Sequence, residues 1–202
     1  MGGSRMSDAQ PPTSLDPRVV RSRDRVLAGT VELVIERGIA GTTIEAVSER
    51  TGVARTTIYR HWPSQSALVL AAFGSVLQVP SAPDSGSLRD DLLVLVEGLA
   101  AALAGPAARL MPALIDAAER DPRFAALHRE EATTRHAPVL LVIRRGIARG
   151  ELPPETDPVD VLDLVTGPLF YRRWVGAGRV DADYVRTVVD TVLTAYGTPR
   201  PS

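Results

Sequence analysis

The chain has 202 residues, 45% of them hydrophobic, and its 23 basic and 24 acidic side chains leave a formal net charge of -1. This length suits one large or two small domains, with enough apolar side chains to bury a core. Cysteine is absent, which excludes disulfide bonds, thiolate metal sites and cysteine nucleophiles. Lysine is absent too, so every permanently charged basic side chain is an arginine.

The N-terminal residues and the length of the apolar runs bear on the cellular compartment of the protein. No apolar run approaches the ~18 residues of a membrane-spanning helix, and the first residues lack the apolar stretch of a signal peptide. We therefore expect a cytoplasmic protein with no membrane partner. Met1 to Arg5, before a second methionine at Met6, is typical of a cloning remnant. Residues 1–17, rich in Ser, Pro and Gly, are expected to form a disordered arm.

Charge is distributed unevenly along the chain. Residues 1–75 carry nine arginines against seven acidic side chains, whereas residues 76–202 carry fourteen against seventeen. A mildly basic N-terminal part on an acidic body permits nucleic-acid binding without requiring it.

The first predicted helix begins near Pro17 and ends at Gly38. Its apolar face has the spacing i, i+4, i+7, i+8, formed by Leu27, Val31, Val34 and Ile35. A short second helix follows, for which either Thr42, paired with Glu45 in a capping box, or Thr43 can be the N-cap. Gly52 ends this helix, and a third short helix is predicted over residues 53–62.

The rest of the chain is predicted to be helical as well. A fourth helix over residues 65–79 precedes the clearest linker of the chain, at residues 80–87. Further helices are expected near residues 88–104, 107–120, 123–150, 158–177 and 181–196. Because no segment shows strict period-two alternation, strands are not expected. The predicted fold is all-α with roughly nine helices.

The stretch from Thr42 to His61 has the size and punctuation of a helix-turn-helix. Its inward positions are apolar, whereas its last helix presents a polar row outward. That row consists of Arg55, Thr56, Thr57, Tyr59, Arg60 and His61. Arginine can pair bidentately with guanine and threonine can contact thymine, while Thr43 at a helix N-terminus can bind a phosphate. Four arginines at the start of the first helix could follow the DNA backbone: Arg18, Arg21, Arg23 and Arg25.

The segment from Thr42 to Ser64, with its run Ile58-Tyr59-Arg60-His61-Trp62-Pro63, closely resembles the N-terminal signature of TetR-family transcriptional regulators. The resemblance covers about residues 20–73, and a weaker one to an actinobacterial-type subgroup rests on residues 167–172. It implies DNA contacts by Thr43, Arg55, Thr56, Thr57, Tyr59 and His61, with Arg60 beside them. The family usually has a phosphate-contacting lysine where this chain has Gln65, which can form a hydrogen bond but brings no charge.

The resemblance implies an organisation in two domains. A helix-turn-helix domain over residues 18–64 would bind DNA, and residues 65–202 would form a larger helical bundle for effector binding and dimerisation. The expected function is a homodimeric repressor of a palindromic operator, released by a small-molecule effector. An activator of the same family is the alternative, and a helical-bundle enzyme or a protein-interaction module is a more distant one. We find no phosphate loop, catalytic triad or metal-ligand spacing in the sequence, so no cofactor, metal or catalytic residue is predicted.

Two sets of residues are candidates for the roles of the C-terminal bundle. The last two helices are expected to form the dimer interface, although the same residues could fill an internal core: Val161, Leu162, Leu164, Val165, Leu169, Phe170, Tyr171, Trp174, Val185, Val188, Val189, Val192, Leu193 and Tyr196. Candidate lining residues of an effector pocket, which could equally be plain core, are Phe73, Leu77, Met111, Leu114, Ile115, His136, Phe170, Tyr171 and Trp174. Pro112 and Pro168 lie inside helical patterns and could open room for a ligand.

Overall fold

The computed structural model describes residues 17–77, 81–105, 107–176 and 178–197. Within these ranges the chain forms nine helices and no strand, which confirms the predicted all-α class. The helices are α1 (Pro17–Arg37), α2 (Ile44–Thr51), α3 (Arg55–His61), α4 (Gln65–Val76), α5 (Leu88–Ala104), α6 (Ala107–Arg120), α7 (Pro122–Ala148), α8 (Pro158–Trp174) and α9 (Ala182–Tyr196). The expected N-terminal arm lies outside the described residues, apart from Pro17.

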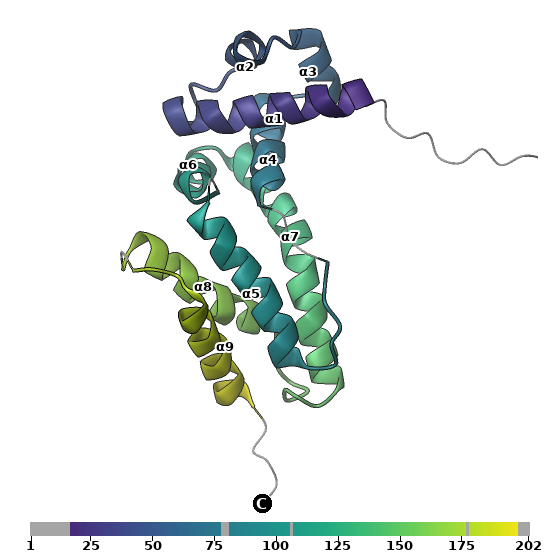
Figure 1. The fold of residues 1–202 in the computed structure, drawn as a ribbon, viewed down its shortest axis with the longest axis vertical. Coiled ribbons are helices and arrows are strands. Elements are labelled where there is room, and N and C mark those ends of the chain that lie inside the picture. The colour runs from purple at the N-terminus through teal and green to yellow at the C-terminus, as the bar shows by residue number, and fades with distance from the viewer. Residues whose placement is uncertain (1–16, 78–80, 106, 177, 198–202) are drawn as a thin grey trace, which may run out of the picture.

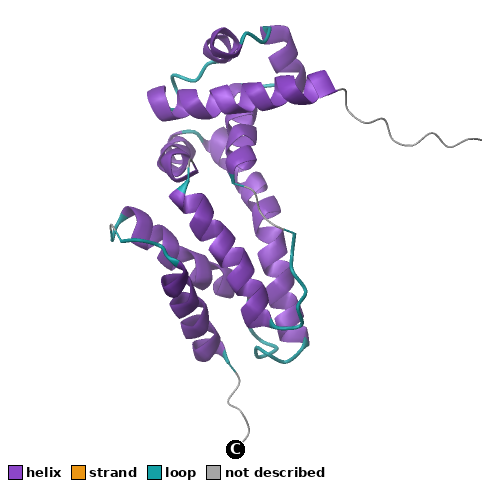
Figure 2. Cartoon of the chain, viewed as in Figure 1, coloured by secondary structure: helices purple, strands orange, loops and turns teal. Residues whose placement is uncertain are grey.

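The arrangement separates a small head (α1–α3) from a longer body (α5–α9), with α4 running between them (Figure 1). α1 lies across the top of the body, and α2 and α3 lie on the side of α1 that faces away from it. The body is built from the long helices α5 and α7, with α8 and α9 on one flank. Only helices and connecting loops are drawn along the described chain (Figure 2).

Local sequence signals set the bounds of α2. The N-cap is Thr43, whose hydroxyl oxygen accepts a hydrogen bond from the backbone N–H of Ala46 at 3.2 Å. The other candidate, Thr42, donates its hydroxyl to the carbonyl oxygen of Gly38 at 2.8 Å instead. Gly52 ends the helix with a φ of 68°, a left-handed conformation that glycine adopts without the steric cost of a Cβ.

One apolar core joins the head to α4 and to the upper part of the body. Val47, Ile58 and Phe73 are fully buried in it, together with Leu114 from α6 and Phe124 from α7. Because α4 packs in the same core as α1–α3, the packing does not break at the predicted domain boundary after residue 64.

The buried face of α1 differs in one position from the prediction. Leu27, Val31 and Val34 are buried, but Ile35 is 36% exposed. Thr30 and Leu33 are buried instead. The reason is that α2, α4 and α6 all pack against α1 and cover a face of the helix to which Ile35 does not belong.

α1 and α2 are held together by charge and by a close approach. The guanidinium of Arg50 on α2 donates to Glu32 at 3.1 Å and to Glu36 at 2.7 Å, both on α1. At Gly29 a Cβ would lie 2.5 Å from the Cγ2 methyl of Thr51, so α2 packs against the bare backbone of α1 there. These contacts fix the orientation of α2, and therefore that of α3, on α1.

A second core lies within the body and is formed by α5, α7, α8 and α9. Most residues predicted for the dimer interface belong to it and serve the packing of a single chain: Val161, Leu162, Val165, Leu169, Val185, Val188, Val189 and Val192. The reason is that α8 and α9 use these faces against α5 and α7 of the same chain. Leu164 and Tyr171, by contrast, are exposed.

The segment predicted as a linker is fastened to the body over its described part, residues 81–87. The backbone N–H of Ser85 donates to the carboxylate of Asp91 at 2.9 Å, and Arg145 Nη1 donates to the carbonyl oxygen of Pro83 at 3.1 Å. Arg145 also lies 3.6 Å from the carboxylate of Asp84. Helices α5 and α7 therefore hold this stretch by hydrogen bonds, although its composition is typical of a loose connection.

Over the described residues, no helix on its own has both the length and the apolar character needed to cross a membrane. One pair, α5 with α6, passes the same test by length and composition, and its two helices meet at 89°.

Candidate nucleic-acid interface and internal cavity

The short helix α3 presents a polar surface on the outside of the head. Ile58 is fully buried and anchors the helix to the core. Five of the six predicted contact residues on α3 are exposed and Thr57 is half-buried; the exposed ones are Arg55, Thr56, Tyr59, Arg60 and His61. A helix that buries one residue and exposes donors and rings on its other faces fits a major groove.

Arg55 forms an exposed ion pair with Glu45 on this surface. Its Nη1 atom lies 3.4 Å from a carboxylate oxygen of Glu45 in the first turn of α2, and both side chains are more than half exposed. The pKa of Glu45 is lowered, chiefly by a hydrogen bond with its own backbone and also by those with Arg55 and Thr43. Exposed ion pairs of this kind are weak, so the guanidinium can leave Glu45 for a base or a phosphate.

Further polar groups surround α3. Thr43, exposed at the N-cap of α2, accepts a backbone hydrogen bond, and its hydroxyl also interacts with the carboxylate of Glu45. Three arginines of α1 are exposed, namely Arg21, Arg23 and Arg25, whereas the side chain of Arg18 lies outside the described residues. A shallow hollow of about 150 Å³ separates α3 from the start of α1 and is lined by Val19, Ser22, Thr57, Arg60 and His61.

Gln65 makes an internal contact. Its amide Nε2 donates to the carbonyl oxygen of Ile39, in the loop between α1 and α2, at 2.6 Å. This hydrogen bond uses one of the two N–H donors of the amide and holds the side chain against the loop between α1 and α2.

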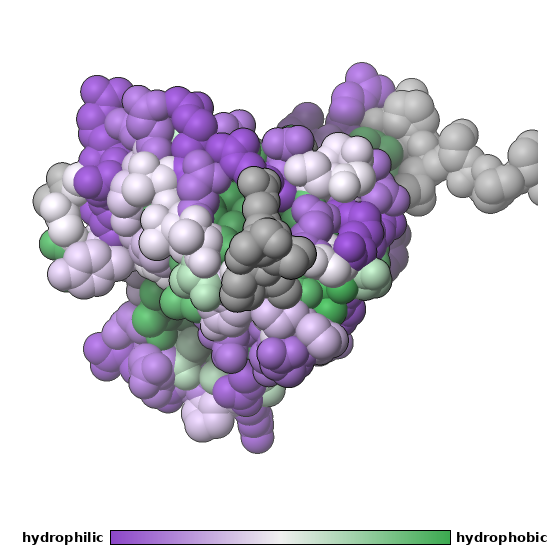
Figure 3. All heavy atoms as spheres, turned by 90° about the horizontal axis from the view of Figure 1, so that it is seen from below, coloured by the Kyte–Doolittle hydropathy of each residue, from purple (hydrophilic) through white to green (hydrophobic). Residues whose placement is uncertain are grey.

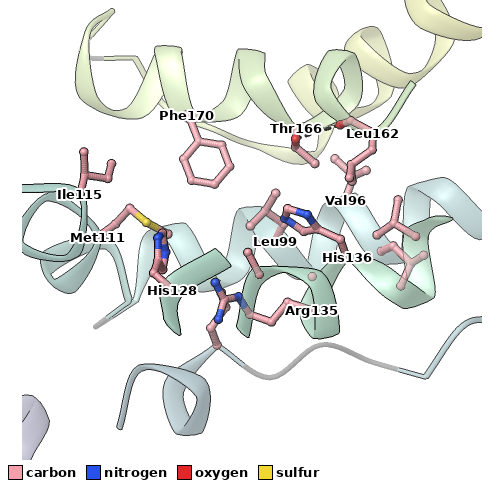
Figure 4. A pocket seen from close by; sticks show the side chains of 15 residues that line it. Val96, Leu99, Met111, Ile115, His128, Arg135, His136, Leu162, Thr166 and Phe170 are labelled. Carbon is pink, nitrogen blue, oxygen red and sulfur yellow. Dashed lines mark hydrogen bonds between the residues drawn. The ribbon is translucent and has the colours of Figure 1, made fainter. Parts of the chain in front are cut away.

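The body contains a cavity of about 370 Å³ between the end of α4 and helices α5, α6, α7 and α8 (Figure 4). In the close-up, Phe170 and Thr166 reach from α8 toward His128, Arg135 and His136, which come from α7. Its lining is mostly apolar: Leu77, Leu95, Val96, Gly98, Leu99, Met111, Ile115, His128, Ala132, Arg135, His136, Val139, Leu162, Thr166 and Phe170. Volume and lining are those of a small-molecule site.

The predicted pocket residues divide into two groups. Five of them line the cavity: Leu77, Met111, Ile115, His136 and Phe170. The other four do not. Phe73 and Leu114 fill the core that α4 and α6 share with the head. Tyr171 is 63% exposed on α8. Trp174 stacks against Phe170, with 5.4 Å between the ring centroids.

Sequence reasoning missed the main polar residues of the cavity. His128, Arg135 and Thr166 line it alongside His136. A signal for two of them was available, because His128, Ala132, Arg135, His136 and Val139 follow the spacing i, i+4, i+7, i+8, i+11 of one helix face. Arg135 lies on this face, and its side chain is only 12% exposed.

The cavity is positively charged through Arg135. Its guanidinium lies over the ring of Phe73, 4.9 Å from the centroid, and its Nη1 atom is buried without a hydrogen-bond partner among the described residues. The nearest carboxylate, Glu131, is 3.9 Å away. Burial, and secondly the charge of Arg135, lowers the pKa of both His128 and His136. Both imidazoles are therefore neutral at pH 7, and Arg135 is the fixed charge of the lining.

The described residues contain no group of three or more His, Asp or Glu side chains that could hold a metal ion.

Comparison with known proteins identifies the chain at the level of its family. Residues 26–72 match the family model described as bacterial regulatory proteins, tetR family, and residues 82–192 match the model of the tetracyclin repressor-like C-terminal domain. The HTH-type transcriptional regulator Mb1581 of Mycobacterium bovis is 30% identical over 194 residues, 96% of each chain. The DNA-binding transcriptional repressor TetR of Mycobacteroides abscessus is 28% identical over 171 residues, 83% of this chain and 90% of that protein.

A solved structure shows the same architecture. The TetR family transcription regulator SCO0332 is 29% identical and superposes with a TM-score of 0.67, over 86% of this chain and 97% of that one. The two family models together span the head and nearly all of the body, so the likeness is not confined to the helix-turn-helix. The chain therefore belongs to the TetR family and is a DNA-binding transcriptional regulator, not an enzyme.

Proposed function

We propose that the protein acts in the cytoplasm as a homodimeric repressor that binds a palindromic operator through α3 and is released by a small molecule bound in the cavity. The observation that carries the DNA-binding part is the polar row of α3, exposed on the side of the head that faces away from the body (Figure 1). Repression rather than activation is favoured because the relative from Mycobacteroides abscessus is named a transcriptional repressor.

In this proposal the residues of the head divide into base contacts and phosphate contacts. Arg55, Thr56 and Thr57 would read base edges, because they lie in the first turn of a helix that would enter the major groove N-terminus first. Thr43 and Tyr59, with Arg60 and His61 beside them, would bind phosphates and fix the register. Gln65 would take no direct part while its amide stays on Ile39.

An exposed stripe on α8 supports the proposed dimer. Leu164 and Tyr171 are 44% and 63% exposed and lie one above the other on the helix, with Gly167 and Pro168 between them. Val175, 67% exposed, extends the same face. Seen from the end opposite the head, apolar surface appears in separate patches, some on the left, the side on which α8 and α9 lie in Figure 1, and others on the right (Figure 3). A partner helix on this stripe would bury it and hold two heads about 34–36 Å apart, one DNA turn.

The position of the cavity supports effector control. Leu77, directly after α4, lines it, and α4 packs against α1. A ligand that prefers one position of α4 would therefore prefer one spacing of the two heads. A coupling of about 1–3 kcal/mol between the sites changes operator affinity about 5- to 150-fold.

Selection from a random duplex library at moderate salt tests the proposal, with Arg55→Ala/Tyr59→Ala run beside the parent. We expect the parent to enrich an inverted repeat and the double variant to enrich none, because each lost base or phosphate contact removes affinity. Arg144→Ala, which removes an exposed arginine of the body, is the matched control and should select the same repeat as the parent.

The variant Leu164→Glu tests the dimer interface independently of the DNA contacts in the same selection. A charge in the middle of the α8 stripe should give a folded monomer that no longer enriches the repeat. Enrichment of the same repeat by the Arg55→Ala/Tyr59→Ala variant would contradict the role given to α3, and a dimeric Leu164→Glu protein would contradict the interface.

A further inference from the structure

We propose that the cavity takes an amphipathic organic anion, with a carboxylate or similar acidic group on Arg135 and an apolar body against α5, α6 and α8. This inference rests on the proposed role of the cavity as the effector site and names the chemical class of the effector. It comes from the contrast between one buried, incompletely paired guanidinium and an otherwise apolar lining.

The first step is the state of Arg135. Its side chain is 12% exposed and its Nη1 has no hydrogen-bond partner among the described residues. Glu131, at 3.9 Å, is beyond hydrogen-bonding distance and is itself about half exposed. An arginine in this position remains protonated, and a buried donor without an acceptor carries a cost in free energy. An acceptor on a ligand would remove that cost.

The second step is the charge of the other groups around the cavity. No carboxylate belongs to its lining, and the carboxylate that competes for the guanidinium, that of Glu131 at 3.9 Å, is about half exposed and holds it weakly. The hydroxyl of Thr166 donates to the carbonyl oxygen of Leu162 at 2.8 Å and is not free to act as a donor. Because burial lowers the pKa of His128 and of His136, we treat both imidazoles as neutral at pH 7. Each of them can then add a hydrogen bond to an anion, but no charge. Asp163 acts on His136 from α8 but does not line the cavity.

The third step is the shape of the lining away from Arg135. Val96 and Leu99 from α5 face Leu162 and Phe170 from α8, and Met111 lies at the end toward α6 (Figure 4). A ligand with its acid on Arg135 would place its remaining atoms among these side chains. A small, fully hydrated anion such as phosphate would leave this surface uncovered, so the apolar part is needed as well as the charge.

Arg135 also connects the ligand to the head. Its guanidinium covers the ring of Phe73, which is fully buried on α4. A carboxylate that draws the guanidinium into the cavity weakens this cation–π contact and changes the packing against α4. The group that recognises the ligand therefore contacts the helix that leads to α1–α3.

Titration calorimetry on the full chain, without DNA, tests the inference with two matched probe pairs: decanoate against decanol, and 1-naphthylacetate against its amide. At pH 7.5 we expect at least one acid to bind about 10- to 100-fold tighter than its neutral partner, since charge-assisted hydrogen bonds exceed neutral ones. Arg135→Gln should abolish this preference while leaving binding of the neutral probe unchanged. Arg135→Lys, which keeps the charge, should retain part of the preference.

Arg144→Gln on the exposed face of α7 is the control and should keep the full preference of the parent. Thermal unfolding of each variant by circular dichroism confirms that it is folded. Equal affinity for acid and neutral partner in both pairs, binding of neither acid, or an unchanged preference in folded Arg135→Gln would overturn the inference. Each of these results leaves operator selection by the parent untouched, whereas carboxylate binding that fails to release the operator would contradict the proposed effector control alone.

Discussion

The head and the body of this protein use their apolar residues in opposite ways. In the head, most apolar residues are packed in a core, with Val47 and Ile58 fully buried, and the outer face of α3 is polar. The body instead keeps a cavity of about 370 Å³ among its apolar side chains and leaves a stripe of them exposed on α8. In the proposed function, the head holds one rigid surface and the body accepts other molecules inside and beside it.

The difference bears on how a signal can pass between the two regions. A filled core transmits a displacement, because it has no space in which to absorb it. A hollow body can change shape when the cavity is filled. Since α4 and α6 share the core of the head, the proposed effector control would pass a movement at the cavity to α1 through packed side chains.

The largest expected effect comes from two neighbours on α6 that face the two regions. Leu114 is 1% exposed in the shared core, whereas Ile115 is 49% exposed at the cavity. Leu114→Ala should lower the free energy of unfolding by about 2–5 kcal/mol, because it leaves a hole in close packing. Ile115→Ala should cost less than about 1 kcal/mol. Urea unfolding of both variants checks this, and equal costs would show that the shared core is not tighter than the cavity wall.

A smaller effect is expected where α2 packs against the backbone of α1. Gly29→Ala would place a methyl 2.5 Å from Thr51 Cγ2, and the Thr51 hydroxyl is already bonded to the carbonyl oxygen of Val47 at 2.7 Å. We expect a loss of about 1–3 kcal/mol from overpacking. Gly74→Ala on α4, which meets nothing within 4 Å, should instead gain about 0.5–1 kcal/mol as a helix-interior glycine is replaced. Thermal denaturation distinguishes these opposite signs, and a stabilised Gly29→Ala protein would contradict the close approach.

The smallest effect concerns the charges that orient the head. The hydrogen bond with Arg50 lowers the pKa of Glu36 below its ordinary value of 4.5. Its contribution to stability is therefore present above pH 4.5 and is lost as the pH falls through the lowered value. Glu36→Gln should be slightly less stable than the parent at pH 7, and urea unfolding should show this deficit shrinking as the pH falls below 4.5. Glu49→Gln, which changes an exposed carboxylate on α2, should track the parent throughout, and a Glu36→Gln deficit that does not shrink with falling pH would rule out the charge as its cause.

The sequence by itself determined the helices and the helix-turn-helix surface. Glycine, proline and N-cap residues act within a few positions along the chain, so Thr43 and Gly52 bound α2 wherever α2 packs. The row on α3 was predictable for the same local reason: once Ile58 is buried, the helical period turns Arg55 and Tyr59 outward.

Tertiary structure decided which apolar residues are core, cavity wall or surface. Leu114 and Ile115 have side chains of the same apolar kind, and so do Leu162 and Leu164. In each pair one side chain is buried and the other is exposed, because a neighbouring helix covers only one of the two. The same holds for charge, since α4 brings Phe73 against the guanidinium of Arg135. Such contacts join residues far apart along the chain, and no periodicity within one segment encodes its partner.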